Sequence, residues 1–359
     1  MNKKIIFSAG GTGGHIFPAI NLMKHFFDKG YKVLLVTDKR GKGFINNNSK
    51  FKFYVLRAET PTNKNFLQKL KSYLVIFYSL LKSILILKRE KPDLVVGLGG
   101  YVSFPISFVS KLFNLPLVIY ENNLVLGRAN KFLLPITKKI LFAKKIKKNF
   151  PEKYESKASI VGSILSKDII NFTHHEQKES KERFSILILG GSQGAEIFGE
   201  VVPSVIKMIK DKGYEIEVNQ QCIKGQKNSI IDYYNKNKIK NYVFEFDKNI
   251  LELIKSTDLA ITRCGASTTA ELVNTVTPFI AVPLPHSIDN HQYLNASFYK
   301  DKGCCLILEQ SNFDTKNLFN LIMETIIDKN KLVKIRKNMK KNSNKEVYAA
   351  IENELKEFI

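Results

Sequence analysis

The chain has 359 residues and a hydrophobic content of 44%, which is enough for two domains that each bury a core. Its formal net charge of +23 indicates attraction to nucleic acid, anionic lipid or an acidic substrate, although the Lys-rich composition that an AT-rich genome produces would raise the charge as well. The four cysteines have neither disulfide nor metal-site spacing, and no signal-peptide run follows the N-terminus, so we expect a cytoplasmic protein.

A strand, a glycine loop and a helical pattern follow one another twice. Apolar residues 3–9 run into the loop Gly10–Gly14, and residues 183–189 run into the loop 190–195. Further predicted strands lie at 31–37, 93–98, 116–121, 214–220, 242–246, 258–262 and 278–284. Because strands that alternate with helices form parallel sheets, the sequence predicts an α/β protein with two Rossmann-like domains. Ligands of such sheets bind at the carboxyl ends of the strands, so we expect two domains that face a central cleft.

The domain boundary is predicted from a change in composition. Residues 160–182 pass from apolar to polar and lose periodicity, as expected of a hinge. The predicted domains are therefore 1–161 and 162–340. Residues 341–359 form an amphipathic helical pattern that either ends the second domain or crosses back to the first.

The glycine loops predict anion sites, since backbone N–H groups can approach an anion there and the helix end adds about half a positive charge. Asp38 would suit the ribose of a dinucleotide, but Ile16 stands where that fingerprint needs a third glycine, and no P-loop Lys follows. A third cluster, "GLGGYVSFP" at 97–105, is either a tight turn or a second anion site. Together the loops favour two phosphate-bearing substrates.

Six motifs occur in order along the chain: "GGTGGHIFPA", "GLGGYVSFP", "YENN", "GGSQGA", "CGASTTAEL" and "DNHQYLNA". In this set the sequence resembles the MurG family of GT-B-fold glycosyltransferases throughout its length. That family transfers N-acetylglucosamine (GlcNAc) from UDP-GlcNAc to the C4 hydroxyl of N-acetylmuramic acid (MurNAc) in undecaprenyl-diphospho-MurNAc-pentapeptide (lipid I), which gives lipid II for peptidoglycan. The resemblance implies a GT-B fold with an acceptor-binding, membrane-associating N-terminal domain and a UDP-GlcNAc-binding C-terminal domain.

The resemblance also implies which residues contact the substrates. The acceptor diphosphate would lie against Gly11, Gly99, Gly100 and Tyr101. The expected substrate-binding residues are Thr12, Gly13, Gly14, Asn123, Ser166, Ser192, Gln193, Ala266, Ser267, Thr268, Thr269, Glu271 and Gln292.

His15 and Asn123 are the candidate catalytic residues. A sugar hydroxyl is a poor nucleophile, and an imidazole can take its proton near neutral pH. His15 is therefore the candidate base, and the alternative is that it binds phosphate or caps the helix. Asn123 would orient the acceptor or donor sugar. The family usually has Gln before this Asn, where this chain has Asn122.

Glu271 lies near the start of the helix that "CGAST" opens, where its carboxylate would accept both ribose hydroxyls or act only as a favourable helix N-terminal charge. The residues Ala266 to Thr269 would donate to the donor diphosphate, and Gln292 would hold the GlcNAc hydroxyls. One departure concerns the donor: the family's Gly-Asn-Pro-Val-Arg is replaced by Gly162 to Ser166, so an arginine contact is lost. Lys167 would replace it only as a point charge.

We expect neither a metal nor a cofactor, since no Asp-x-Asp pair occurs and helix ends with glycine amides would stabilise the leaving UDP. No carboxylate nucleophile for a covalent intermediate is evident. A single displacement that inverts the α-linked donor to a β1,4 link is therefore the expected mechanism.

Residues 66–88 are strongly apolar, but Lys82 interrupts a run that is short for a membrane span. The stretch is either a core helix or a helix whose outer face rests on the bilayer, flanked by Lys64, Lys69, Lys71 and Lys88. A second basic cluster lies at 138–148. We expect peripheral attachment to an anionic membrane surface, at the cytoplasmic face of the plasma (inner) membrane, and no nucleic acid partner.

Two other functions stay open at this stage. One is another UDP-sugar enzyme of the same fold, either a glycolipid glycosyltransferase or a UDP-GlcNAc 2-epimerase. The other is a basic nucleotide-binding protein without enzymatic activity. Duplex binding without UDP affinity would indicate the last of these.

Overall fold

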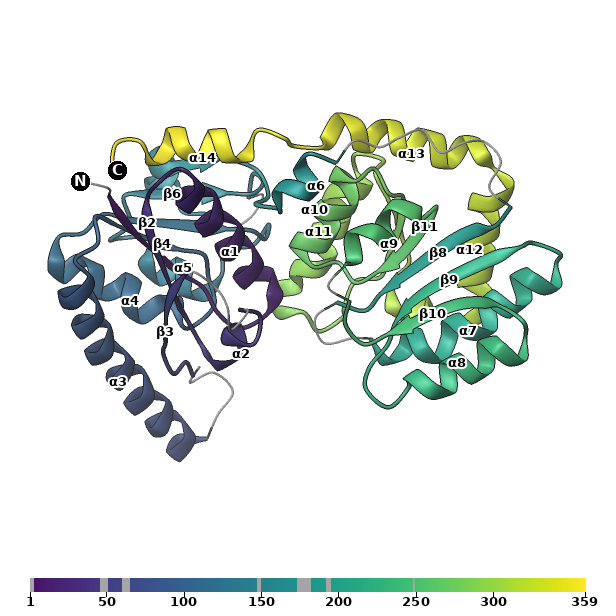
Figure 1. Cartoon of the computed structure of the whole chain (residues 1–359), viewed down its shortest axis with the longest axis horizontal. Helices are drawn as coiled ribbons and strands as arrows, with labels where there is room; N and C mark the ends of the chain where they lie inside the picture. Colours follow the sequence, from purple (N-terminus) through teal and green to yellow (C-terminus); the bar gives the residue numbers. More distant parts are fainter. Residues whose placement is uncertain are drawn as a thin grey trace. The chain divides into compact units, whose positions relative to one another are not determined.

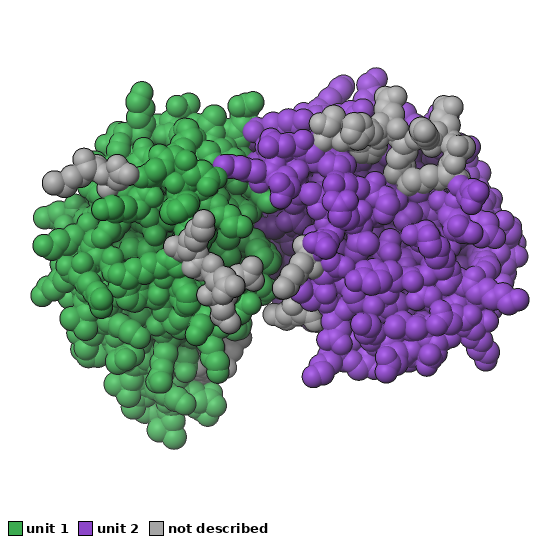
Figure 2. All heavy atoms as spheres, viewed as in Figure 1, with its two compact units in different colours: residues 1–166, 346–359 green, residues 167–345 purple. Residues whose placement is uncertain are grey.

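The chain divides into two units that are each built around one parallel sheet. The computed structural model describes residues 3–45, 51–59, 65–146, 150–172, 182–191, 195–247 and 249–359. Unit 1 contains residues 1–166 and 346–359, and unit 2 contains residues 167–345 (Figures 1 and 2). The first boundary therefore follows residue 166 instead of residue 161, and unit 2 ends at 345 instead of 340.

In its described residues, unit 1 has a seven-stranded parallel sheet with the order β3-β2-β1-β4-β5-β6-β7. The strands are β1 (Lys4–Ser8), β2 (Lys32–Thr37), β3 (Lys52–Val55), β4 (Leu94–Gly97), β5 (Leu117–Glu121), β6 (Lys139–Phe142) and β7 (Ala158–Ile160). The helices of unit 1 are α1 (Gly13–Asp28), α2 (Lys39–Lys42), α3 (Phe66–Glu90), α4 (Ser103–Ser110), α5 (Arg128–Leu133) and α14 (Val347–Leu355), with short 3-10 turns at Lys111–Phe113 and Glu152–Lys157. The interior strand β1 has the consecutive apolar residues Ile5, Ile6 and Phe7, all fully buried, because helices cover both faces of the sheet.

The described residues of unit 2 form a six-stranded parallel sheet with the order β10-β9-β8-β11-β12-β13 and a hydrophobic core on each face. Its strands are β8 (Phe184–Leu189), β9 (Ile216–Gln221), β10 (Lys240–Phe244), β11 (Leu259–Thr262), β12 (Phe279–Ala281) and β13 (Leu306–Ile307). Its helices are α6 (Lys167–Ile170), α7 (Glu196–Asp211), α8 (Lys227–Lys236), α9 (Ile250–Ser256), α10 (Ala266–Asn274), α11 (His291–Lys300), α12 (Thr315–Ile327) and α13 (Lys329–Asn342), with 3-10 turns η3 (Ile288–Asn290) and η4 (Gln310–Asn312).

The C-terminal helix α14 packs on unit 1. The ring of Tyr348 stacks on His25 of α1 with a centroid distance of 4.4 Å, and its hydroxyl donates to the carbonyl of Leu165 at 2.6 Å. The carboxylate of Glu352 lies 2.6 Å from Nε2 of His25 and forms an ion pair with Lys29 at 2.6 Å. Of the two placements that the sequence left open for this helix, the structure has the one on the N-terminal unit (Figure 1).

The stretch 138–148, expected as a basic membrane-facing cluster, contains the buried strand β6. Lys139 pairs with Glu354 and Glu357 of the C-terminal segment at 2.8 and 3.0 Å, and Lys144 is buried. Residues 147 and 148 lie outside the described part of the chain. Lys138 and Lys145 are exposed, so the contact of this basic cluster with a membrane stays a prediction.

Candidate active site

Two glycine loops of unit 1 pack directly on each other. The first links β1 to α1, and the second links β4 to α4. The amide of Gly10 donates to the carbonyl of Gly99 at 3.3 Å. A Cβ on Gly100, whose φ is +79°, would lie 2.4 Å from the carbonyl oxygen of Gly10, so only glycine fits at this contact. The first and third glycine clusters of the sequence thus form one backbone surface.

Asp38 is occupied by the protein itself. Its carboxylate accepts the amides of Gly11 at 3.0 Å and Gly41 at 2.7 Å, and Arg40 lies 3.8 Å away. The carboxylate therefore shapes the glycine loop, which agrees with the exclusion of a dinucleotide ribose site from the sequence.

His15 lies in the first turn of α1 and packs against the second glycine loop. Its Nδ1 is 3.0 Å from the carbonyl oxygen of Leu98. Since a carbonyl can only accept, Nδ1 carries the hydrogen in the neutral ring, and Nε2 carries the lone pair. A Cβ on Gly99, whose φ is +100°, would lie 2.7 Å from Nδ1. The backbone of this loop therefore sets the tautomer that a base needs.

Asn123 is positioned by the buried carboxylate of Glu121. One oxygen of Glu121 accepts the backbone amide of Asn123 at 3.0 Å and its side-chain amide at 3.2 Å. The other accepts Gly127 N at 2.8 Å and Asn130 Nδ2 at 3.0 Å. With four bonds within its own loop, Glu121 acts as a structural group. The Asn123 side-chain oxygen is then the end that can accept from a sugar hydroxyl.

Asn122 links the first glycine loop to the residues that lead out of unit 1. Its Nδ2 donates to Gly14 O at 3.4 Å, and its Oδ1 lies 3.1 Å from the hydroxyl of Tyr120. That hydroxyl also lies 3.1 Å from Gly162 O and accepts the amide of Ile164 at 3.1 Å. Burial raises the pKa of Tyr120, so its hydroxyl keeps its proton. This hydrogen-bond network connects the turn that carries His15 to residues 162–164.

The expected donor residues Ala266 to Thr269 follow the carboxyl end of β11. Ser192 and Gln193 fall outside the described residues. Ala266 begins α10, so the first backbone amides of this helix have no acceptor within it and can bind an anion. Ser267 and Thr268 are half-buried, whereas Thr269 is fully buried. The hydroxyl of Thr269 donates to Gly265 O at 3.0 Å, so its proton is used within the helix itself.

Glu271 is a half-buried carboxylate in the second turn of α10. Burial raises its pKa to about 7, and this is the only cause of the shift. A carboxylate that is kept from water in this way gains from accepting donors on a ligand.

Gln292, in α11, holds two segments of the donor site with one oxygen. Its Oε1 accepts the amides of Cys264 at 3.1 Å and Leu284 at 3.0 Å. The side-chain nitrogen is therefore the end that can donate to a sugar hydroxyl. Ser166 is the last residue of the N-terminal segment of unit 1, and Tyr101 is exposed beside Gly100.

Sequence reasoning missed Arg263, which directly precedes the "CGAST" motif at the carboxyl end of β11. Its guanidinium is buried and stacks over the ring of Phe198, with 5.0 Å between its central carbon and the ring centroid. A charged residue directly after the buried strand β11 was the available signal.

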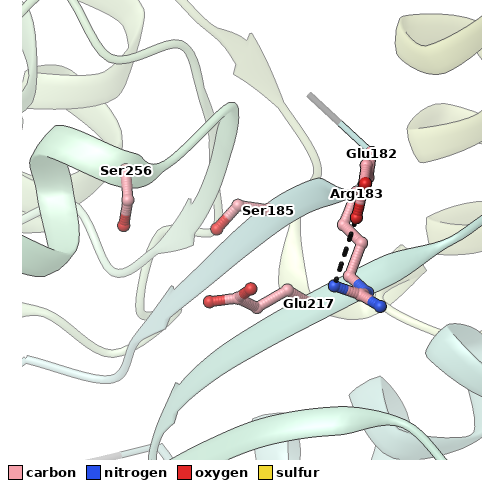
Figure 3. Close-up of a pocket in the computed structure, with 5 residues that line it drawn as sticks. All are labelled: Glu182, Arg183, Ser185, Glu217 and Ser256. Atoms are coloured by element: carbon pink, nitrogen blue, oxygen red, sulfur yellow. Dashed lines mark ion pairs between the residues drawn. The ribbon is translucent and has the colours of Figure 1, made fainter. Parts of the chain in front are cut away.

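A cavity of about 240 Å³ lies at the opposite end of the unit 2 sheet, near the amino ends of β8 and β9. It is lined by Glu182, Arg183, Ser185, Glu217 and Ser256. Figure 3 shows Ser185 and Glu217 pointing to the side on which Ser256 lies. This cavity contains none of the expected site residues.

Two Rossmann-like units with glycine loops at the carboxyl ends of their strands define the GT-B class of enzymes, which use nucleotide sugars. Within this class, the chain belongs to glycosyltransferase family 28. The family's N-terminal domain matches residues 5–142, and its C-terminal domain matches residues 185–354.

Curated relatives match the chain over almost its full length. A UDP-N-acetylglucosamine–N-acetylmuramyl-(pentapeptide) pyrophosphoryl-undecaprenol N-acetylglucosamine transferase of Pelagibacter ubique is 36% identical and covers 95% of this chain and 94% of the relative. The protein of the same name from Rickettsia felis is 37% identical over 90% of this chain and 91% of the relative. The crystal structure of MurG from Acinetobacter baumannii shares the fold, with a TM-score of 0.79, 24% identity and 99% of both chains covered.

Proposed function

We propose that this chain transfers GlcNAc from UDP-GlcNAc to the C4 hydroxyl of MurNAc in lipid I, which gives lipid II for peptidoglycan synthesis. The observation that carries the proposal is the likeness, at 36 and 37% identity over at least 90% of both chains, to transferases whose names specify this donor and acceptor. The glycine-loop surface of unit 1 and the α10 end of unit 2 support it, since each suits one diphosphate.

His15 is the proposed base. As the C4 oxygen of MurNAc attacks the anomeric carbon of GlcNAc, Nε2 takes the hydroxyl proton, and the bond to UDP breaks with its electron pair leaving on the diphosphate. The Nδ1 contact with Leu98 O supports this role because it leaves the lone pair on Nε2. Attack opposite to the leaving group inverts the α-linked donor to a β1,4 link. Asn123 orients a sugar through its side-chain oxygen.

Unit 2 is the proposed donor site. Glu271 accepts the ribose hydroxyls, and the first amides of α10 together with Ser192 and Gln193 donate to the diphosphate. The nitrogen of Gln292 donates to GlcNAc hydroxyls, since its oxygen already accepts two backbone amides. No metal or other cofactor takes part in the proposed reaction.

We further propose peripheral attachment to the cytoplasmic face of the plasma (inner) membrane through α3. Among the described residues, α3 is the one helix that is long and apolar enough to cross a membrane by length and composition. Three small polar side chains of α3, those of Ser72, Ser79 and Ser83, are buried against the rest of unit 1, whereas many of its large apolar side chains are exposed. The large exposed side chains along it are Phe66, Leu67, Leu70, Tyr73, Leu74, Phe77, Tyr78, Leu81 and Leu85.

The contacts of α3 with unit 1 support docking instead of spanning. Ser79 donates to Arg57 O at 2.7 Å, and Lys82 donates to Val55 O at 3.3 Å. Glu90, at the C-terminal end, pairs with Lys4 and Lys52. A helix held in this way offers its apolar face to the lipid while it stays part of the fold.

The distribution of charge supports an anionic surface as the partner. Unit 1 carries 30 Lys and Arg against 12 Asp and Glu, whereas unit 2 carries 26 against 21. The net charge of +23 therefore divides into +18 and +5, and most of it belongs to the unit that presents α3. This coincidence favours membrane lipid over nucleic acid as the source of the anions.

The experiment is incubation with UDP-GlcNAc labelled in the sugar and a water-soluble lipid I analogue. We expect label in the product that carries the acceptor, and only when both substrates are present. UDP-ManNAc formed without acceptor would instead indicate a 2-epimerase, and labelled glycolipid formed only with a different acceptor would indicate another glycosyltransferase. A matched reaction without the acceptor separates transfer from hydrolysis of the donor.

A further inference from the structure

Arg263 carries a buried charge whose hydrogen-bond partners, among the described residues, are all neutral. Its Nη1 donates to the carbonyls of Val282 at 3.2 Å and Pro283 at 3.4 Å, and its Nη2 donates to Gln310 Oε1 at 2.6 Å. No Asp or Glu in the described part of the chain pairs with it. Burial lowers the pKa of Arg263, but a guanidinium stays protonated at neutral pH.

Another guanidinium of unit 2 shows the contrast. Arg336, on α13, is also shielded from water, and burial lowers its pKa in the same way. It has an acidic partner, however, because Asp258 lies 4.0 Å from its Nη2. A buried charge without a counter-charge is unfavourable unless an anion arrives, so Arg263 requires an explanation that Arg336 does not.

Arg263 also joins the segments that form the donor end of unit 2. Its backbone amide donates to Leu189 O, at the end of β8, at 3.1 Å. Its Cβ lies 3.8 Å from the place where Gly191 would carry a Cβ. The guanidinium reaches the end of β12 and η4, and it covers Phe198 in the first turn of α7. These are the strand ends at which a parallel sheet binds its ligand.

We propose that Arg263 is an electrostatic positioning residue for the diphosphate of the nucleotide donor. Its charge is compensated when the diphosphate binds at the adjacent loop and helix ends, without direct contact through its occupied N–H groups. The inference rests on the proposed function, since it takes UDP-GlcNAc as the donor. It also provides a cation for the donor in a chain that lacks the family's arginine at Ser166.

The test compares ligands with and without phosphate. Calorimetry measures the dissociation constants of UDP and uridine for the full chain and for Arg263→Met, a neutral side chain of similar length. We expect UDP affinity to fall about tenfold while uridine affinity changes less than about twofold. Arg263→Lys should retain most of the preference for UDP. Arg336→Met is the matched control and should leave the ratio of the two constants unchanged.

Other results would overturn the inference. If Arg263→Met leaves the preference for UDP over uridine unchanged, with or without an equal loss of affinity for both ligands, the side chain has only a structural role. If Arg263→Met does not fold, Arg263→Gln and Arg263→Lys provide the same comparison. The preference for UDP over uridine should then fall only in the Gln variant. A wild-type chain that is folded yet binds no UDP would refute the proposed donor itself, and this outcome is distinct from an unchanged ratio.

Discussion

Glu271 illustrates how a proposed ligand-binding residue opposes stability. Burial raises the pKa of this carboxyl to about 7, from about 4.5 in the unfolded chain. Its contribution to stability is therefore fully present below about pH 4.5 and is lost as the pH rises through 7. Above pH 7 the folded protein holds a half-buried carboxylate, which donors on a nucleotide would stabilise.

Replacement of Glu271 by Gln should separate these two effects. At pH 8 the neutral amide should stabilise the fold by about 1 to 2 kcal/mol, less than the full shift implies because the side chain is only half-buried. UDP affinity should fall, since charge-assisted bonds to the ribose are lost. Thermal unfolding at pH 5 and pH 8, with calorimetric titration of UDP, measures both. Equal UDP affinity in the variant would remove Glu271 from the donor site.

His15 is the other residue whose role can be isolated. If His15 is the base, its replacement by Ala or Gln should lower kcat by about 10²- to 10⁴-fold, with little change in UDP affinity. The wild-type rate should fall on the acid side as the imidazole gains a proton, and this limb should be absent in both variants. Because Gln can hydrogen-bond but cannot take a proton, near-normal activity in His15→Gln would show that His15 only binds substrate.

The helix α3 shows where a sequence pattern misleads at the scale of an element. Its apolar residues predict either a core helix or a membrane-facing helix, and the pattern alone does not choose. The serines at 72, 79 and 83 turn inward, and nine large apolar side chains between Phe66 and Leu85 turn outward, the reverse of a helix that packs in water, whereas Ile86 and Leu87 near the C-terminal end are buried. Residues 138–148 show a second mixed pattern, because a buried strand is flanked by the exposed Lys138 and Lys145.

Membrane attachment through α3 predicts a salt-dependent interaction with anionic vesicles. Sedimentation should retain the protein at low salt and release much of it at about 1 M salt, where the Debye length is about 3 Å. The double variant Leu74→Ser/Phe77→Ser should bind at least about tenfold more weakly, since two exposed apolar side chains no longer enter the lipid. Phe246→Ser, at an exposed site of unit 2, is the control. Equal binding by all three proteins would refute the docking surface.

At the scale of the whole molecule, the repeated strand, loop and helix pattern was sufficient to predict two Rossmann-like domains, and the resemblance in six motifs implied the GT-B fold. The positions of the boundaries were not predictable. Residues 162–165 are buried in unit 1 and form hydrogen bonds with the hydroxyls of Tyr120 and Tyr348, although their composition resembles that of a linker. The placement of α14 depends on His25, Lys29 and Lys139, which lie far away in the sequence.

The candidate site was also predictable only in part. Loops that a motif defines, such as Gly10–Gly14 and the start of α10, were found from sequence. The contacts of His15 with the Leu98 carbonyl and of Asn123 with the Glu121 carboxylate became evident only from the structure. Arg263 was missed because its significance lies in the absence of an acidic partner among the described residues around it, which a sequence does not reveal.

The central claim is direct transfer of GlcNAc to lipid I with inversion. The most direct measurement is proton NMR of the product isolated after incubation with UDP-GlcNAc and a lipid I analogue, together with the amount of UDP released. The account predicts one UDP per product and a GlcNAc that is β1,4-linked to MurNAc. An α-linked product, or conversion of the donor to UDP-ManNAc without use of the acceptor, would contradict it.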